Sequence, residues 1–200
     1  MKKHVLHRAL TVVAVLAATI AVVPAAPATA RPAGDTGRLS NRVPAPPARP
    51  THKAPPGSAA PQARAFAPGQ DICYVAFVHD RGWQSWVCNG DLSGTRGEKI
   101  WIDSLAFIQW GAGTVCATAF LNGFGWQNER CGTDNQVFQV GTIGFNLGVH
   151  GLVMSVTAAT LCFRVAVVLS TWADELCTTN GGIGGISSPF EIDAFLAYFR

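Results

Sequence analysis

The chain has 200 residues and a formal charge of +3 at pH 7, but the charge is unevenly divided. Residues 31–70 carry six Lys or Arg and one Asp, a net of +5, whereas residues 71–200 carry six Lys or Arg and eleven Asp or Glu, a net of −5. The acidic part has aromatic residues that are not interleaved with basic ones, so the composition argues against nucleic acid as a partner.

Residues 1–30 have the pattern of an export signal. A positively charged start precedes an apolar run over residues 9–23, and Ala28-Thr29-Ala30 supplies the small residues that a signal peptidase needs. The apolar run is shorter than the roughly 20 residues that cross a bilayer. We therefore predict cleavage after Ala30, a secreted protein that is extracellular or associated with the cell wall, and no membrane span after cleavage.

Residues 31–70 have the composition of a disordered linker. Nine of these forty residues are Pro, and few of the others could build a core. Such a segment cannot bury enough apolar surface to offset the entropy lost on ordering, so it should stay extended. Its positive charge would suit contact with an anionic cell wall or membrane surface, and a solvated tether is the alternative.

Residues 71–200 have the pattern of one all-β domain. Short apolar runs are interrupted by Gly, Asn and Asp every 8–12 residues, and no segment shows helical periodicity. One unit, Cys-x9-Trp-x4-Cys, occurs three times and uses every cysteine in the chain. It predicts three internal repeats over about residues 72–112, 115–157 and 161–200.

The spacing within the unit predicts a disulfide-bonded hairpin. If Asp80-Arg81 forms a two-residue turn, Cys73 lies directly opposite Cys88, and the other two copies behave in the same way. An even number of regularly spaced cysteines in an exported protein indicates disulfides, and zinc is disfavoured because CxxC spacing is missing. The expected pairs are Cys73–Cys88, Cys116–Cys131 and Cys162–Cys177.

The same two-residue turn would place the repeated tryptophan on the face opposite the cysteines. We therefore expect Trp83, Trp126 and Trp172 in the structural core, although the corresponding face of the second copy is mixed and includes Asn128 and Arg130. A short polar residue also recurs after each glycine-rich turn, and we expect it to cap a turn or accept a buried hydrogen bond. These recurring residues are Asp103, Asn146 and Asp193.

The first copy resembles a ChW repeat, the clostridial hydrophobic repeat named for its tryptophan. The matching stretches include Gly82-Trp83-Gln84, Trp86-Val87, Ser93-Gly94-Thr95 and Ile102-Asp103-Ser104-Leu105. The other two copies match in part, and the six cysteines would make this a disulfide-containing variant. The resemblance implies an extracellular binding module that has no catalytic residues and no cofactor.

Three β-repeats of this length suggest pseudo-threefold closure, either as a β-prism-like arrangement, which we prefer, or as a β-trefoil. Because a fold requirement recurs in every copy, residues that break the repeat are the better candidates for ligand binding. Exposed tryptophan can stack on a sugar, and short polar side chains can bond its hydroxyls. These candidates are Trp86, Asn89, Asp91, Trp101 and Trp110.

The chain has no recognisable catalytic or metal-binding motif, so we predict neither an enzyme nor a metal site. The favoured function is a secreted module that recognises a cell-surface or extracellular carbohydrate, such as a cell-wall polymer. The alternative is a secreted effector or inhibitor that binds another protein.

Overall fold

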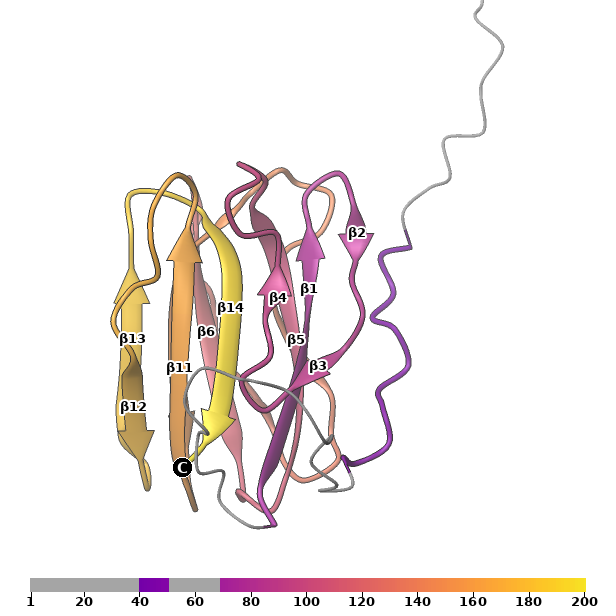
Figure 1. Cartoon of the computed structure of the whole chain (residues 1–200), viewed down its shortest axis with the longest axis vertical. Helices are drawn as coiled ribbons and strands as arrows, with labels where there is room; N and C mark the ends of the chain where they lie inside the picture. The colour runs from indigo at the N-terminus through magenta and orange to yellow at the C-terminus, as the bar shows by residue number, and fades with distance from the viewer. Residues whose placement is uncertain (1–39, 51–68) are drawn as a thin grey trace, which may run out of the picture. The chain divides into compact units, whose positions relative to one another are not determined.

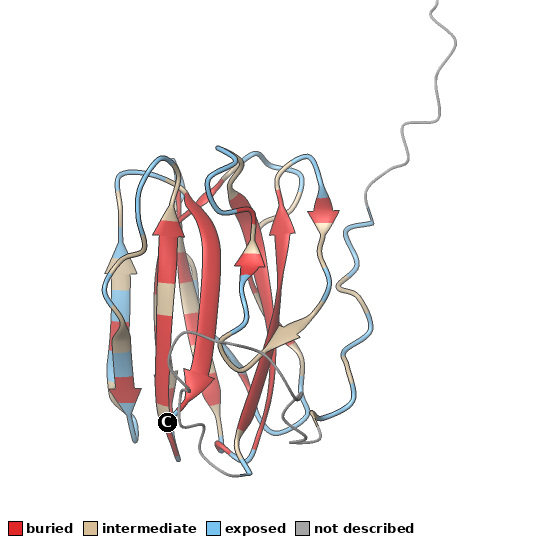
Figure 2. Cartoon of the chain, in the orientation of Figure 1, coloured by how far each residue is buried: buried red, intermediate tan, exposed pale blue. Residues whose placement is uncertain are grey.

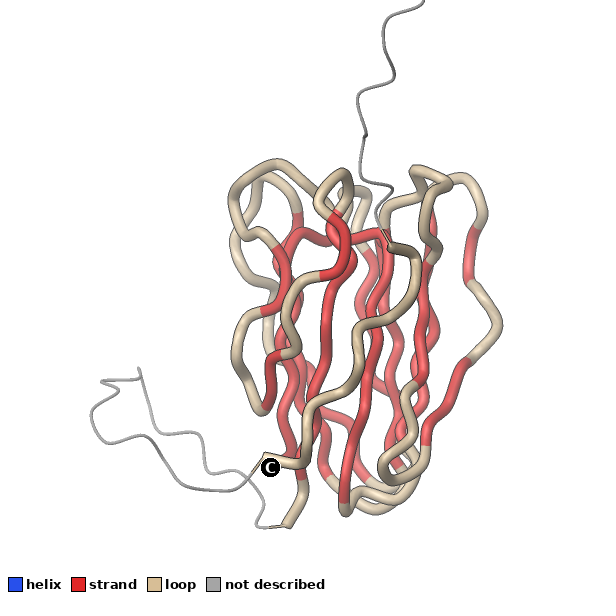
Figure 3. Tube along the Cα trace, turned by 90° about the vertical axis from the view of Figure 1, so that its right-hand side faces the viewer, coloured by secondary structure: helices blue, strands red, loops and turns tan. Residues whose placement is uncertain are grey.

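The computed structural model of the protein describes residues 40–50 and 69–200. The predicted signal peptide and the remainder of the predicted linker lie outside these residues. The described part is all-β, as predicted, and contains fourteen strands and no helix (Figure 3). Among these residues, no helix has the length and apolar character needed to cross a membrane.

The strands run in chain order through the three repeats. They are β1 (Asp71–Val78), β2 (Gly82–Trp83), β3 (Val87–Cys88), β4 (Ser93–Gly94), β5 (Ile102–Trp110), β6 (Val115–Leu121), β7 (Gly125–Trp126), β8 (Arg130–Gly132), β9 (Phe138–Gly141), β10 (Val149–Val156), β11 (Thr160–Val167), β12 (Leu176–Thr179), β13 (Ile183–Ser187) and β14 (Ile192–Phe199).

These strands form three antiparallel sheets, each centred on two long strands of one repeat. The central pairs are β1 with β5, β6 with β10, and β11 with β14 (Figure 1). The short strands that follow the first cysteine strand of each repeat, such as β2 and β3, pair along its free edge. Three separate sheets around one core are the prism-like arrangement rather than a trefoil.

Each sheet is completed by a strand from the next repeat. Strand β9 of the second repeat pairs with β5 of the first, and β13 of the third pairs with β10 of the second. Strand β4 of the first repeat pairs with β14 of the third, which closes the cycle. Because every repeat both gives and receives an edge strand, no repeat can complete its sheet alone.

A bulge marks the place where each donated strand meets its sheet. The register of the central pairs skips one residue in every sheet, and the skipped residues are Asp103, His150 and Asp193. Each of the three backbone carbonyls accepts a hydrogen bond from the donated strand or the residue after it, over 2.7–2.9 Å. The predicted recurrence was therefore wrong in its second member, because the counterpart of Asp103 is His150 and not Asn146.

One hydrophobic core lies between the three sheets and draws on all of them. Figure 2 shows the long central strands as buried along most of their length. Phe195 of β14 occupies the centre of an aromatic cluster: its ring centroid lies 5.0 Å from that of Tyr74, 5.7 Å from that of Phe107 and 6.3 Å from that of Phe163. This side chain therefore packs against core aromatic residues of the first repeat, in addition to the pairing of β4 with β14 that joins the first and third repeats.

The three disulfides join the predicted pairs, and every described cysteine is used. Each bond connects residues that face each other across the hairpin, such as Cys73 of β1 and Cys88 of β3. The repeat spacing therefore predicted both the bonded pairs and their register.

The prediction that the tryptophans lie on the face opposite the cysteines fails because the hairpin loop has three residues rather than two. Val78 pairs with Gly82, and Arg81 N donates to Val78 O over 3.1 Å. Trp83 consequently faces Phe77, on the cysteine side of the strand, since a shift of one residue reverses every side chain. The same pairing occurs for Trp126 with Phe120 and for Trp172 with Ala166.

A second irregularity restores the register at the cysteines. Between Trp83 and Val87 the second strand has one more residue than its partner β1, as expected of a β-bulge. The two irregularities compensate each other, so the cysteine pairing was predicted correctly from a turn that does not exist.

Candidate functional site

Trp126 is the most exposed of the three repeated tryptophans, and it does not lie in the core. Its side chain is 47% exposed and packs edge-on against Phe120, with ring centroids 5.3 Å apart. Trp83 and Trp172 are half-buried, and Trp172 packs against the core and lies under the guanidinium groups of Arg96 and Arg164. The assignment of Trp126 to the structural core is therefore wrong.

An open groove of about 820 Å³ surrounds Trp126 on the second repeat. Its walls combine aromatic rings with amide and guanidinium groups. The side chains that define it include Phe124, Trp126, Gln127, Asn128, Arg130 and Gln139. Phe124 is 67% exposed, so two large rings are presented to solvent beside polar groups. Such a combination is typical of ligand sites, where apolar area provides contact and a few polar groups provide orientation.

Two of the polar side chains in the groove are held in place by the fold. Gln127 Oε1 accepts from Gly141 N over 2.7 Å, and Gln139 Nε2 donates to Ser104 Oγ over 2.8 Å. Asn128 and Arg130 are exposed and, within the described residues, make no side-chain hydrogen bond to the protein. The groove thus has fixed amides in its wall and two polar groups with unused donors at its rim.

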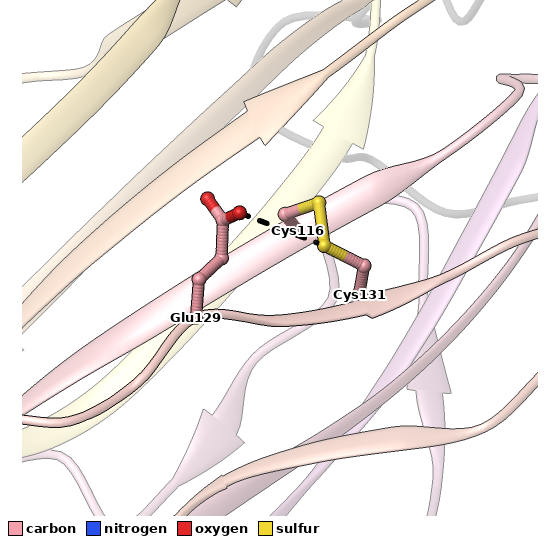
Figure 4. Close-up of side chains that lie close together, drawn as sticks. All are labelled: Cys116, Glu129 and Cys131. Atoms are coloured by element: carbon pink, nitrogen blue, oxygen red, sulfur yellow. Dashed lines mark hydrogen bonds between the residues drawn. A yellow bond between two sulfur atoms is a disulfide. The ribbon is translucent and has the colours of Figure 1, made fainter.

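The carboxylate of Glu129 lies beside the second disulfide (Figure 4). Glu129 Oε2 is 3.7 Å from Cys131 Sγ, and Cys116, Glu129 and Cys131 form a compact group with metal-ligating atom types. Cys162, Glu175 and Cys177 form a similar group in the third repeat. A disulfide sulfur carries neither a proton nor a thiolate charge, so neither group offers the thiolate ligands that a zinc site uses.

A second cluster connects the first hairpin loop to the bulge in β5. His79 Nδ1 lies 2.9 Å from Asp103 Oδ2, Trp101 Nε1 donates to Asp103 Oδ1 over 2.9 Å, and the His79 and Trp101 rings are stacked. Burial raises the pKa of Asp103 above its usual 3.8, against the opposing effects of its hydrogen bonds and of the His79 charge. Both carboxylate oxygens are already engaged, which is the arrangement of a loop anchor.

The raised pKa of Asp103 predicts a pH dependence of stability with a defined sign. The folded state keeps its proton to higher pH than the unfolded state, so this contribution is present below pH 3.8 and is lost as pH rises through the folded pKa. We expect the free energy of unfolding of wild type to rise relative to that of Asp103→Asn as pH falls from 7 to 4. Urea unfolding of both proteins at each pH measures this difference. A constant difference across the range would contradict the shift.

The five predicted ligand residues do not form one site. Trp101 stacks on His79, whereas Trp110 is buried and packs with Cys73 and Ile108. Asp91 is exposed, and its backbone carbonyl accepts from the Tyr74 hydroxyl.

Trp86 and Asn89 lie on the outside of the first sheet. Trp86 Nε1 donates to Pro44 O over 3.3 Å. The Asn89 side chain bonds both Asp71 and the backbone of Ile72. The candidates are therefore spread over the first repeat, and none of them lines the groove on the second.

Sequence reasoning missed the Trp126 groove although one signal was available. The repeated tryptophan of the second copy has Asn128 and Arg130 close by in sequence, where the first and third copies have Ser85, Val87, Asp174 and Leu176. A polar, basic surrounding is unfavourable for a core tryptophan, and it marks this copy as the exposed one.

Comparison with known proteins supports the relationship suggested by the first repeat. No curated protein and no solved structure matches the chain. Residues 77–100 match the family described as ChW, clostridial hydrophobic W. This stretch extends from the end of β1 through Trp83 and β4 to Ile100, so the match supports the ChW family for the first repeat.

Proposed function

We propose that the protein is a secreted, non-catalytic module of three degenerate ChW repeats that binds an extracellular carbohydrate in the Trp126 groove. The observation that carries the proposal is the exposure of Trp126 beside Phe124 in a groove with fixed amides. Three disulfides are typical of proteins that act outside the cell. The family match is to a repeat unit and supports a module rather than an enzyme.

The chemistry of the groove suits a sugar. A pyranose ring presents an apolar C–H face that packs on an indole, and its hydroxyls exchange hydrogen bonds with amide and guanidinium groups. Gln127 and Gln139 are oriented before a ligand arrives, which lowers the entropy lost on binding. Asn128 and Arg130 supply further donors at the rim.

The same groups are poorly suited to general acid–base catalysis. Amides, indole and phenyl rings do not exchange protons near neutral pH, and a guanidinium group keeps its proton. The groove therefore offers contact and orientation without a group to move a proton, which favours binding over catalysis.

Replacing Trp126 with alanine should reduce carbohydrate binding by at least tenfold, because the stacking surface is lost. Retention on insoluble cell-wall polysaccharide, followed by calorimetry with the soluble fragments, measures the effect. Phe145→Ala is the matched control, since Phe145 is 71% exposed and lies outside the groove. Thermal unfolding of both variants checks that the fold is kept.

Two outcomes would contradict the proposal. In the first, wild type shows no retention on any polysaccharide and instead captures a single protein from the culture fraction, which would favour an effector or inhibitor. In the second, Trp126→Ala and Phe145→Ala are retained equally well, which would place the carbohydrate elsewhere.

A further inference from the structure

Residues 43–50, a proline-rich part of the predicted linker, run beside the first sheet (Figure 1). Pro44 O accepts a hydrogen bond from Trp86 Nε1 over 3.3 Å. Farther along, Arg49 Nε donates to Asp71 Oδ2 over 3.1 Å, and Arg49 Nη2 donates to Gly69 O over 2.6 Å. The two ends of the segment are thus fixed to the domain by side-chain hydrogen bonds.

From Pro44 onward, the burial of this segment repeats every three residues, and Val43 before it is also half-buried. Pro44, Pro47 and Pro50 are half-buried, whereas the residues between them, 45, 46, 48 and 49, are exposed. A polyproline II helix has three residues per turn, so prolines spaced by three lie along one edge. The segment therefore presents one proline edge to the domain, in the sequence pattern Pro-x-x-Pro-x-Arg.

The domain supplies the complementary chemistry. An indole N–H directed at a proline carbonyl is suited to polyproline II because this helix has no internal hydrogen bonds and leaves its carbonyls free. Asp71 is fully buried, and its Oδ1 accepts from Asn89 Nδ2 over 2.9 Å, which orients Oδ2 toward the arginine. A carboxylate held in this way distinguishes Arg from an uncharged residue at the last position.

The three receptor residues occur in the first repeat alone. Counted from the cysteines, Asp71 corresponds to Thr114 and Thr160, Trp86 to Glu129 and Glu175, and Asn89 to Gly132 and Thr178. The outer face of the first sheet is also the apolar one, since Cys73, Val75 and Phe77 are all buried there. A requirement of the fold would recur in all three copies, so this set serves a purpose of its own.

We propose that Asp71, Trp86 and Asn89 form a receptor site for proline-rich peptides of the pattern Pro-x-x-Pro-x-Arg. Residues 44–49 occupy this site in cis, and a partner protein bearing the same pattern takes it by displacing them. The cis segment is tethered at a high effective concentration, so it shields the site until it is outcompeted. This site is separate from the Trp126 groove and does not rest on carbohydrate binding.

The test uses the whole chain in two forms. One is wild type, and the other carries Pro44→Ala, Pro47→Ala and Arg49→Ala, which leaves the receptor residues unchanged. A fluorescein-labelled peptide with the sequence of residues 41–50 is titrated into each, and binding is followed by anisotropy. The altered chain should bind the peptide at least tenfold more tightly than wild type, because its own segment no longer competes.

Two matched changes separate specific recognition from general adhesion. Trp86→Phe, added to the altered chain, keeps an aromatic ring but removes the N–H donor, and a peptide with Ala in place of Arg49 removes the charge. Each should weaken binding about tenfold, while thermal unfolding confirms that the domain is folded. Equal peptide affinity for both chains, or affinity unaffected by both changes, would overturn the proposal. Binding of a second copy through its own segment would appear as dimerisation of wild type and would overturn occupation in cis.

Discussion

Replacing Gly94 with alanine should lower the free energy of unfolding by about 3 kcal/mol or more. Gly94 lies on β4, where the first repeat joins the sheet of the third, and it has a φ of 111°. A Cβ atom at this position would lie 2.3 Å from the carbonyl oxygen of Asp193. Because that oxygen belongs to the backbone of the bulge, it cannot move without breaking the strand pairing.

Gly97→Ala is the control for this experiment. Gly97 also has a positive φ, of 82°, but a Cβ atom there would have no neighbour within 4 Å. It should cost about 1 kcal/mol, the penalty for a left-handed backbone alone. Urea unfolding of the oxidised proteins measures both. Similar losses for the two variants would show that β4 is not held tightly against β14.

Replacing Phe195 with alanine should destabilise the protein by about 3–5 kcal/mol, the usual cost of deleting a fully buried phenyl ring. The ring is completely buried and contacts aromatic side chains of β1, β5 and β11. Its loss should therefore weaken the packing between the first and third repeats, not one sheet alone. Calorimetric and chemical unfolding should both report the change.

Phe190→Ala provides the comparison, since that ring is 53% exposed and precedes the same strand. We expect a loss within about 0.5 kcal/mol, as for most surface substitutions. If Phe195→Ala were as mild as Phe190→Ala, the aromatic cluster would contribute little to the packing between the repeats.

The parts of the fold that recur three times were accessible from the sequence. The cysteine spacing is the same in every copy, and Cys73 pairs with Cys88 as predicted because the bulge after Trp83 compensates for the longer loop. The face on which the tryptophans lie depends on the length of the hairpin loop. Leu169 adopts a φ of 67° at the centre of the third loop, a backbone conformation that a leucine in the sequence does not predict. A loop longer by one residue places the tryptophan on the opposite face of the strand.

The exchange of edge strands was inaccessible for a different reason. Strand β4 has two residues and β9 has four, and pairing over such short segments leaves little periodic pattern. The Gln that follows the tryptophan in two copies was a sequence signal for the exchanged strands. Gln84 Oε1 accepts from Gly94 N and Gln127 Oε1 accepts from Gly141 N, and the third copy lacks this Gln.

The candidate sites show the same division. Trp86 was identified because it breaks the repeat, and it does make a contact that its counterparts do not, although with a proline-rich segment of the same chain. Composition predicted that this segment is extended. The spacing of Pro44, Pro47 and Pro50 could not be interpreted from the sequence alone, because it is the structure that places these prolines against the domain surface. Trp126 was missed because its face was assigned from the wrong turn.

The cyclic exchange of strands imposes an order in time. Gly94 pairs with Ala194 across a hundred residues of chain, so during synthesis β4 has no partner until β14 has been made. The first two sheets can receive β9 and β13 as these strands emerge. The third sheet is completed only when β14 is available to pair with β4. The ring of sheets therefore stays open until β14 is present, and a chain truncated before β14 would leave β4 unpaired.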